Sequence, residues 1–144
     1  MQISFSMRSN SQPITLSDLI SFEAILNATL PQDYKQHMLS YNGGLVIPNE
    51  IRHINYDSAD HGISDFYPIK YGFDIMENIF SDLNGIIPSG FISIGKTRGQ
   101  GEIIMSLIND SSYGNIKEWY PDGFNYDLSP SFTQLLNDMI ESDE

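Results

Sequence analysis

Four stretches of the sequence repeat apolar residues every three or four positions, as the buried face of an amphipathic helix does. They predict helices over residues 15–26, 31–41, 71–85 and 129–140. Thr15 with Asp18 predicts a capping arrangement at the start of the first helix. Asn42 and the two glycines after it accept left-handed dihedrals and are expected to end the second. Ser129 followed by proline predicts the cap and first turn of the last.

Short runs rich in β-branched and aromatic residues predict strands between these helices. The sequence carries such runs at residues 3–7, 45–48, 51–56, 66–69, 91–95, 102–108 and 115–120. The last three are separated by glycine-containing turns, so three antiparallel strands are their simplest arrangement. Residues 57–65 are polar, and we predict an exposed loop there.

The order of these elements predicts the α+β class. We expect a single domain, residues 1–144, in which a mostly antiparallel twisted sheet is packed against about four helices. A chain of 144 residues buries roughly two-thirds of its unfolded surface on folding. Its hydrophobic content of 40% and aromatic content of 12% supply enough apolar area for one core.

The net charge of the chain limits the kinds of partner that it is expected to bind. Nineteen acidic residues stand against seven basic ones, which gives a net charge of −12. Such a surface repels phosphate backbones and attracts basic proteins, so we expect no nucleic-acid partner. The same charge is equally typical of proteins kept soluble by acidic residues. With no cysteine and no apolar run of signal or membrane-span length, we expect a cytoplasmic protein with no membrane partner.

Three segments, in order, resemble the signature of the SUKH superfamily. The first is LPQDYKQHMLSYNGG at residues 30–44. The second begins with FISIG at residues 91–95 and continues through an apolar strand to Gly114 and Trp119. The third is SPSFTQLLNDMI at residues 129–140. Each segment is short, but their order and spacing together resemble the family.

The resemblance covers residues 15–141 and implies a mixed α+β domain without catalysis or a cofactor. Bacterial members act mainly as immunity proteins beside polymorphic or contact-delivered toxins, and fungal relatives regulate cell-wall signalling. Residues 45–85 and the turn at residues 96–101 match the family's pattern only loosely. These regions vary between members, so the departures concern the partner rather than the fold.

Residues 90–97 match the spacing of a phosphate-binding loop, with two glycines separated by four residues and followed by Lys96 and Thr97. That chemistry needs a flexible loop whose N–H groups turn inward and a helix directly after it. Here strand formers fill residues 91–94, and the RGQG that follows would break a helix. We therefore predict a strand that enters a hairpin turn.

The polar loop holds the densest group of metal-binding residue types, and its spacing fits no calcium loop. We interpret it as a solvated acidic loop and expect no metal. The residues concerned are Asp57, Asp60, His61 and Asp65. The other histidines, His37 and His53, come with no nucleophile-elbow or serine-hydrolase spacing, so we expect no catalytic residues.

The resemblance and the charge together suggest a protein that binds and neutralises a cognate, basic toxin domain by direct contact. Many antibacterial toxins are nucleases whose basic clefts bind phosphate, and an acidic inhibitor can occupy such a cleft. The alternative is a regulatory or scaffold domain for an endogenous partner, and monomer and dimer both remain open. The predicted contact residues are Asp57, Asp60, Asp65, Asp110, Glu118, Asp122 and Asp127, with Tyr56, Tyr120 and Phe124 as aromatic anchors.

Overall fold

The computed structural model describes residues 3–47, 51–56 and 61–141. Within these residues four helices pack with nine strands that join in one sheet. The helices are α1 (Leu16–Leu26), α2 (Gln32–Tyr41), α3 (Met76–Leu83) and α4 (Phe132–Asn137). The strands are β1 (Ser4–Ser6), β2 (Gly44–Ile47), β3 (Ile51–His53), β4 (Gly62–Phe66), β5 (Phe91–Thr97), β6 (Glu102–Ser106), β7 (Ile116–Trp119), β8 (Asn125–Ser129) and β9 (Met139–Glu141).

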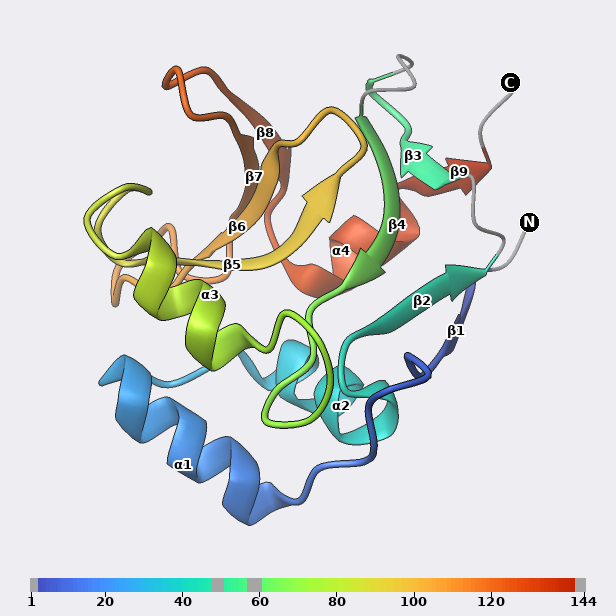
Figure 1. Cartoon of the computed structure of the whole chain (residues 1–144). Helices are drawn as coiled ribbons and strands as arrows, with labels where there is room; N and C mark the ends of the chain where they lie inside the picture. The colour runs from blue at the N-terminus through green and yellow to red at the C-terminus, as the bar shows by residue number, and fades with distance from the viewer. Residues whose placement is uncertain (1–2, 48–50, 57–60, 142–144) are drawn as a thin grey trace.

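The strand pairings in the sheet are antiparallel. The main path runs β1-β2-β4-β5-β6-β7-β8, while β3 pairs with β4 and with β9. Figure 1 shows the sheet curving around α4, with α1, α2 and α3 gathered at its lower end. α3 contacts β5, and α4 contacts both α2 and β8. The predicted α+β class is confirmed.

One cluster of buried apolar side chains joins the helices to the sheet. Phe132 of α4 belongs to it and is 2% exposed. Its ring centroid lies 5.2 Å from that of Tyr34 in α2 and 5.6 Å from that of Phe66 in β4. Both pairs meet edge to face, a geometry that adds to the free energy of apolar burial. The helix after the last long strand therefore fills the concave side of the sheet.

The contacts of Asn42 and Gly43 explain why the first family-like segment, residues 30–44, carries these two residues at the end of α2. Asn42 ends α2 in the left-handed conformation and is fully buried. Its Nδ2 donates to the carbonyl of Ile69 at 2.9 Å, and its Oδ1 accepts the Ile69 N–H at 2.8 Å. At Gly43, φ is +87° and a β-carbon would lie 2.5 Å from the carbonyl oxygen of Tyr67. The predicted left-handed end of this helix is confirmed.

The first helix also begins as predicted. The Thr15 hydroxyl accepts the Asp18 N–H at 3.2 Å, and the Asp18 carboxylate accepts the Thr15 N–H at 2.9 Å. This reciprocal capping box satisfies two N–H groups that a helix start leaves unpaired.

The predicted start of the third helix is wrong. α3 begins at Met76 rather than at residue 71. Gly72 and Asp74 both have positive φ, +115° and +54°, which is incompatible with a right-handed helix. Phe73, which the helical spacing had placed on the apolar face, is 66% exposed.

Both ends of the predicted last helix are also wrong. Ser131, not Ser129, caps α4, because the Ser131 hydroxyl accepts the Gln134 N–H at 3.0 Å. Ser129 is the last residue of β8. The helix stops at Asn137, and the apolar residues after it form β9 against β3. Tertiary pairing thus overrides helical spacing in the final turn.

Besides β9, two more strands lie where no strand was predicted. β4 occupies residues 62–66, mostly inside the predicted polar loop, and it pairs with β2, β3 and β5. The expected run at residues 66–69 is strand only at Phe66. β8 occupies residues 125–129, of which the first three are exposed, so the apolar signal was weak.

The segment with phosphate-loop spacing is a strand, as predicted. Phe91–Thr97 forms β5, which pairs with β6 over most of its length. Its backbone N–H groups therefore belong to the sheet rather than to an anion-binding loop.

Candidate partner-binding site

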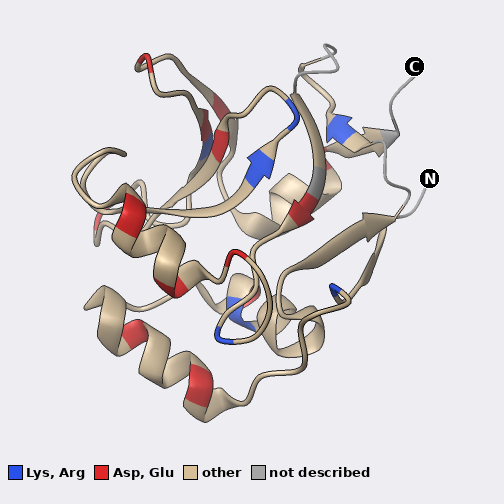
Figure 2. Cartoon of the chain, in the orientation of Figure 1, with Lys and Arg blue, Asp and Glu red and all other residues tan. Residues whose placement is uncertain are grey.

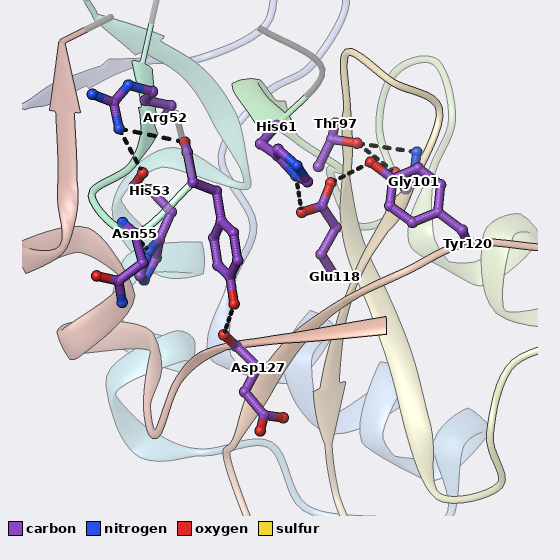
Figure 3. A network of polar contacts seen from close by, with 10 residues as sticks. Arg52, His53, Asn55, His61, Thr97, Gly101, Glu118, Tyr120 and Asp127 are labelled. Carbon is purple, nitrogen blue, oxygen red and sulfur yellow. Dashed lines mark hydrogen bonds and ion pairs between the residues drawn. The ribbon is translucent and has the colours of Figure 1, made fainter. Parts of the chain in front are cut away.

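Five polar and aromatic side chains meet at the end of the sheet opposite α1. Glu118 lies in β7 and Tyr126 in β8, and the two are register partners, so both side chains point to one face. Tyr120 follows β7 directly. Tyr56 comes after β3 and His61 immediately before β4. The curvature of the sheet brings Tyr56 against β8 and His61 against β7. Figure 3 shows His61 beside Glu118.

Glu118 is the buried centre of this group. Its side chain is 1% exposed, and its carboxylate accepts hydrogen bonds from His61 Nδ1 and from the Tyr120 hydroxyl, each at 2.6 Å. An ionised carboxylate only accepts, so His61 must carry a proton on Nδ1. Removing either donor would leave buried charge unsatisfied, which is costly. Glu118 therefore fixes the orientation of both rings.

Aromatic rings are packed closely around this carboxylate. The centroids of Tyr56, His61 and Tyr126 lie 5.3–5.4 Å from one another. Tyr120 and Tyr126 meet at 6.3 Å with their planes 87° apart. The Tyr56 hydroxyl donates to the carbonyl of Asp127 at 2.7 Å, which ties the segment after β3 to β8. Partial burial, with the charges of Asp127 and Glu118, raises the pKa of Tyr56 above its usual value.

A hollow of about 280 Å³ opens beside these rings. We call it the aromatic pocket, and define it by the residues that line it: His61, Gly99, Tyr120, Asp122, Phe124 and Tyr126. Asp122 and Phe124 lie on the turn between β7 and β8, which the Tyr120 N–H closes by donating to the Phe124 carbonyl at 2.9 Å. The Asp122 carboxylate accepts the Phe124 N–H at 3.0 Å. Phe124 is 68% exposed.

Six of the ten predicted contact residues lie in or beside the aromatic pocket. The structure brings together Tyr56, Glu118, Tyr120, Asp122, Phe124 and Asp127. Asp57 and Asp60 lie outside the described residues. Asp65 and Asp110 lie elsewhere: Asp65 is 3.5 Å from the guanidinium of Arg8, and Asp110 accepts the N–H and hydroxyl of Ser112.

Three of these carboxylates have surroundings that differ from the exposed contact positions predicted for them. Glu118 is buried and holds two rings in place, so it does not present its charge directly to solvent. Burial raises the pKa of Asp65 while Arg8 opposes that rise. Hydrogen bonds from Ser112 lower the pKa of Asp110. The Asp110 carboxylate therefore stabilises the turn in which it lies. Asp122 remains as an acidic group at the aromatic pocket, whereas Asp127 pairs with Lys117 at 2.7 Å and, one residue along β8 from Tyr126, points its carboxylate to the opposite face of the sheet.

Three pocket residues, His61, Gly99 and Tyr126, were not among the predicted contacts. His61 was considered as a possible metal ligand, Gly99 as part of a hairpin turn, and Tyr126 lies in the strand that sequence patterning missed. Tyr126 and Leu128 alternate with polar residues, which is a short period-two signal. The long-range contact between His61 and Glu118 has no such local signal, because 57 residues separate them.

A second polar cluster includes a serine, a histidine and an aspartate, but its hydrogen bonding differs from that of a hydrolase. His53 Nδ1 accepts the Asn55 N–H at 3.1 Å, so the ring proton of neutral His53 is on Nε2. His53 Nε2 lies 3.2 Å from the Ser129 hydroxyl oxygen and 3.4 Å from a carboxylate oxygen of Asp138. The Ser129 hydroxyl donates to the same carboxylate oxygen. A catalytic base needs a free lone pair facing the serine. This cluster instead joins β3, β8 and the end of α4.

In the described part of the chain, no three histidine, cysteine, aspartate or glutamate side chains are grouped as metal ligands. Two members of the loop considered above, Asp57 and Asp60, lie outside that part. The other two, His61 and Asp65, are held by Glu118 and Arg8 respectively.

The acidic surplus is spread over the molecule. Figure 2 shows acidic positions on α1 and α3 as well as on the β7–β8 hairpin. Among the described residues, Arg8, Lys35, Lys70 and Lys117 form ion pairs with carboxylates, Lys117 with Asp127 at 2.7 Å. Charge alone therefore does not distinguish one face. The β7–β8 end is distinguished by combining acidic groups with exposed aromatic rings and a hollow.

Four helices packed with one antiparallel sheet define a mixed α+β domain. This chain belongs to the SMI1/KNR4 family (SUKH-1), whose model matches residues 13–138. The resemblance seen in the sequence is thereby confirmed, and membership is consistent with an immunity-type or other binding domain. No curated protein matches the chain. Among the described residues, no helix is long and apolar enough to cross a membrane.

Proposed function

We propose that this chain is an immunity protein that binds a cognate bacterial toxin domain at the aromatic pocket and neutralises it by direct contact. The observation that carries the proposal is the pocket itself, where exposed Phe124 and Asp122 lie beside rings fixed by a buried carboxylate. Aromatic side chains next to a hollow are the usual anchors of tight protein interfaces. Carboxylates at the rim would match a basic partner.

Preorganisation supports a binding role for this surface. Glu118 holds His61 and Tyr120 through two short hydrogen bonds, and the Tyr56 hydroxyl fixes the segment after β3 against β8. Side chains that are already ordered lose little conformational entropy when a partner binds. A surface of this kind can reach high affinity without a large contact area.

The charge of the chain supports the choice of a basic partner. A net charge of −12 raises the encounter rate with a positively charged protein at low salt. Nuclease toxins need basic clefts to hold phosphate, so an acidic inhibitor can cover the cleft as nucleic acid would. Rapid capture matters when few toxin molecules suffice to kill a cell.

Association kinetics with the toxin domain that co-purifies with this chain test this proposal. Asp122→Lys reverses one charge at the aromatic pocket, and Asp82→Lys makes the same change on the exposed surface of α3. We expect Asp122→Lys to slow association at low salt by about tenfold and Asp82→Lys by much less, with the difference shrinking at high salt. Equal effects of the two variants would contradict binding at the aromatic pocket.

A further inference from the structure

The aromatic pocket has the size of a receptor for one side chain. Its volume of about 280 Å³ lies below the range typical of pockets for drug-sized ligands. Tyr120 and Tyr126 stand nearly perpendicular on its wall, and Phe124 extends at its rim. The face of an aromatic ring carries negative π charge, so rings that line a hollow can hold a cation there.

The lining of the pocket and the residue behind it supply carboxylates. Asp122 lines it, and Glu118 lies buried behind His61 and Tyr120. No lysine or arginine is among its described lining residues. The His61 ring, which Glu118 holds through Nδ1, is part of the same lining. A cationic donor therefore has ring faces and a carboxylate within one small volume.

We infer that the aromatic pocket receives a single arginine side chain of the partner. This inference rests on the proposed function, since the arginine would belong to the toxin surface. Arginine fits better than lysine, because its planar guanidinium stacks on an aromatic ring while its N–H groups donate in the plane. The occupant stacks against the rings of Tyr126 and Phe124 and donates to Asp122.

The test uses the purified full chain and N-acetyl-arginine amide, followed by NMR. The neutral control ligand is the citrulline counterpart, which keeps the shape of arginine without its charge. We expect saturable shifts of Gly99, Tyr120, Phe124 and Tyr126 with arginine, and at least about fivefold weaker binding of citrulline. The lysine counterpart should bind more weakly than arginine.

Matched variants separate a specific pocket from a general surface effect. Tyr126→Leu removes a ring from the pocket, whereas Tyr113→Leu removes an equally exposed ring, 37% in each case, from outside it. Asp122→Asn keeps an oxygen for the Phe124 N–H and removes the charge. We expect Tyr126→Leu and Asp122→Asn to weaken arginine binding by about fivefold or more and Tyr113→Leu to leave it unchanged.

Each outcome decides one claim. Equal binding of arginine and citrulline, or no saturable shift in the pocket, overturns the arginine subsite. If the chain still protects cells from the toxin in that case, the proposed function stands without the subsite. Saturable, charge-selective arginine binding in a chain that gives no protection supports the subsite and contradicts the proposed function.

Discussion

At the residue scale, Gly43 shows how a backbone constraint can be separated from a packing constraint. Gly43 and Gly85 have nearly the same dihedral, with φ of +87° and +82°, but only Gly43 faces backbone atoms at close range. A β-carbon at Gly85 would meet nothing within 4 Å. Comparing substitutions at the two glycines therefore separates the cost of the close approach to the Tyr67 carbonyl from the cost of positive φ.

We predict that Gly85→Ala lowers the free energy of unfolding by about 1 kcal/mol, the cost of a left-handed alanine. Gly43→Ala should lower it by on the order of 3 kcal/mol, because the backbone must also move. Urea denaturation of both variants measures the difference. Equal losses would show that the close approach at Gly43 is relieved without cost.

At the element scale, one carboxylate joins two helices that lie far apart in the sequence. Asp33, in the first turn of α2, accepts the N–H and the hydroxyl of Thr133 in α4, each at 2.8 Å. The bond to the Thr133 N–H satisfies one of the donors left free at the start of α4. It also fixes α4 where Phe132 enters the core.

We predict that Asp33→Ala lowers the free energy of unfolding by about 1–2 kcal/mol, because the carboxylate loses three hydrogen bonds, two from Thr133 and one from the Tyr34 N–H. Asp82→Ala on α3 is the control for removing an acidic residue from this highly charged chain. In the Asp33→Ala background, Thr133→Ala should have little further effect, since the two residues share a bond. Strictly additive losses, measured by urea denaturation, would contradict this coupling.

Sequence patterning located the helices better than the strands, for a physical reason. The start of α1 and the end of α2 carry local signals, Thr15 with Asp18 and the run from Asn42, and the structure confirms both. β4 is recognisable only through its neighbours, because its polar residues become strand by pairing with β2, β3 and β5. Such pairings depend on distant parts of the chain and leave little trace in the local pattern.

At the scale of the whole molecule, the curvature of the sheet creates the candidate site. Tyr120, Asp122 and Phe124 are close in sequence, so their common location could be predicted from the β7–β8 turn. The place of His61 in the same pocket could not be predicted, because it depends on the curved sheet bringing β4 and β7 together. The same holds for the burial of Glu118, which looks like an exposed acidic residue in the sequence.

The central claim is that the aromatic pocket binds and neutralises a toxin, and a protection assay tests it most directly. The toxin domain that co-purifies with this chain is expressed with the wild-type chain, with a pocket variant carrying Tyr126→Leu and Asp122→Asn, or with a control carrying Tyr113→Leu and Asp82→Asn. All three proteins are first confirmed to be folded and equally abundant. We predict that the wild type and the control restore growth and that the pocket variant does not. Full protection by the pocket variant, or none by the wild type, would contradict the account.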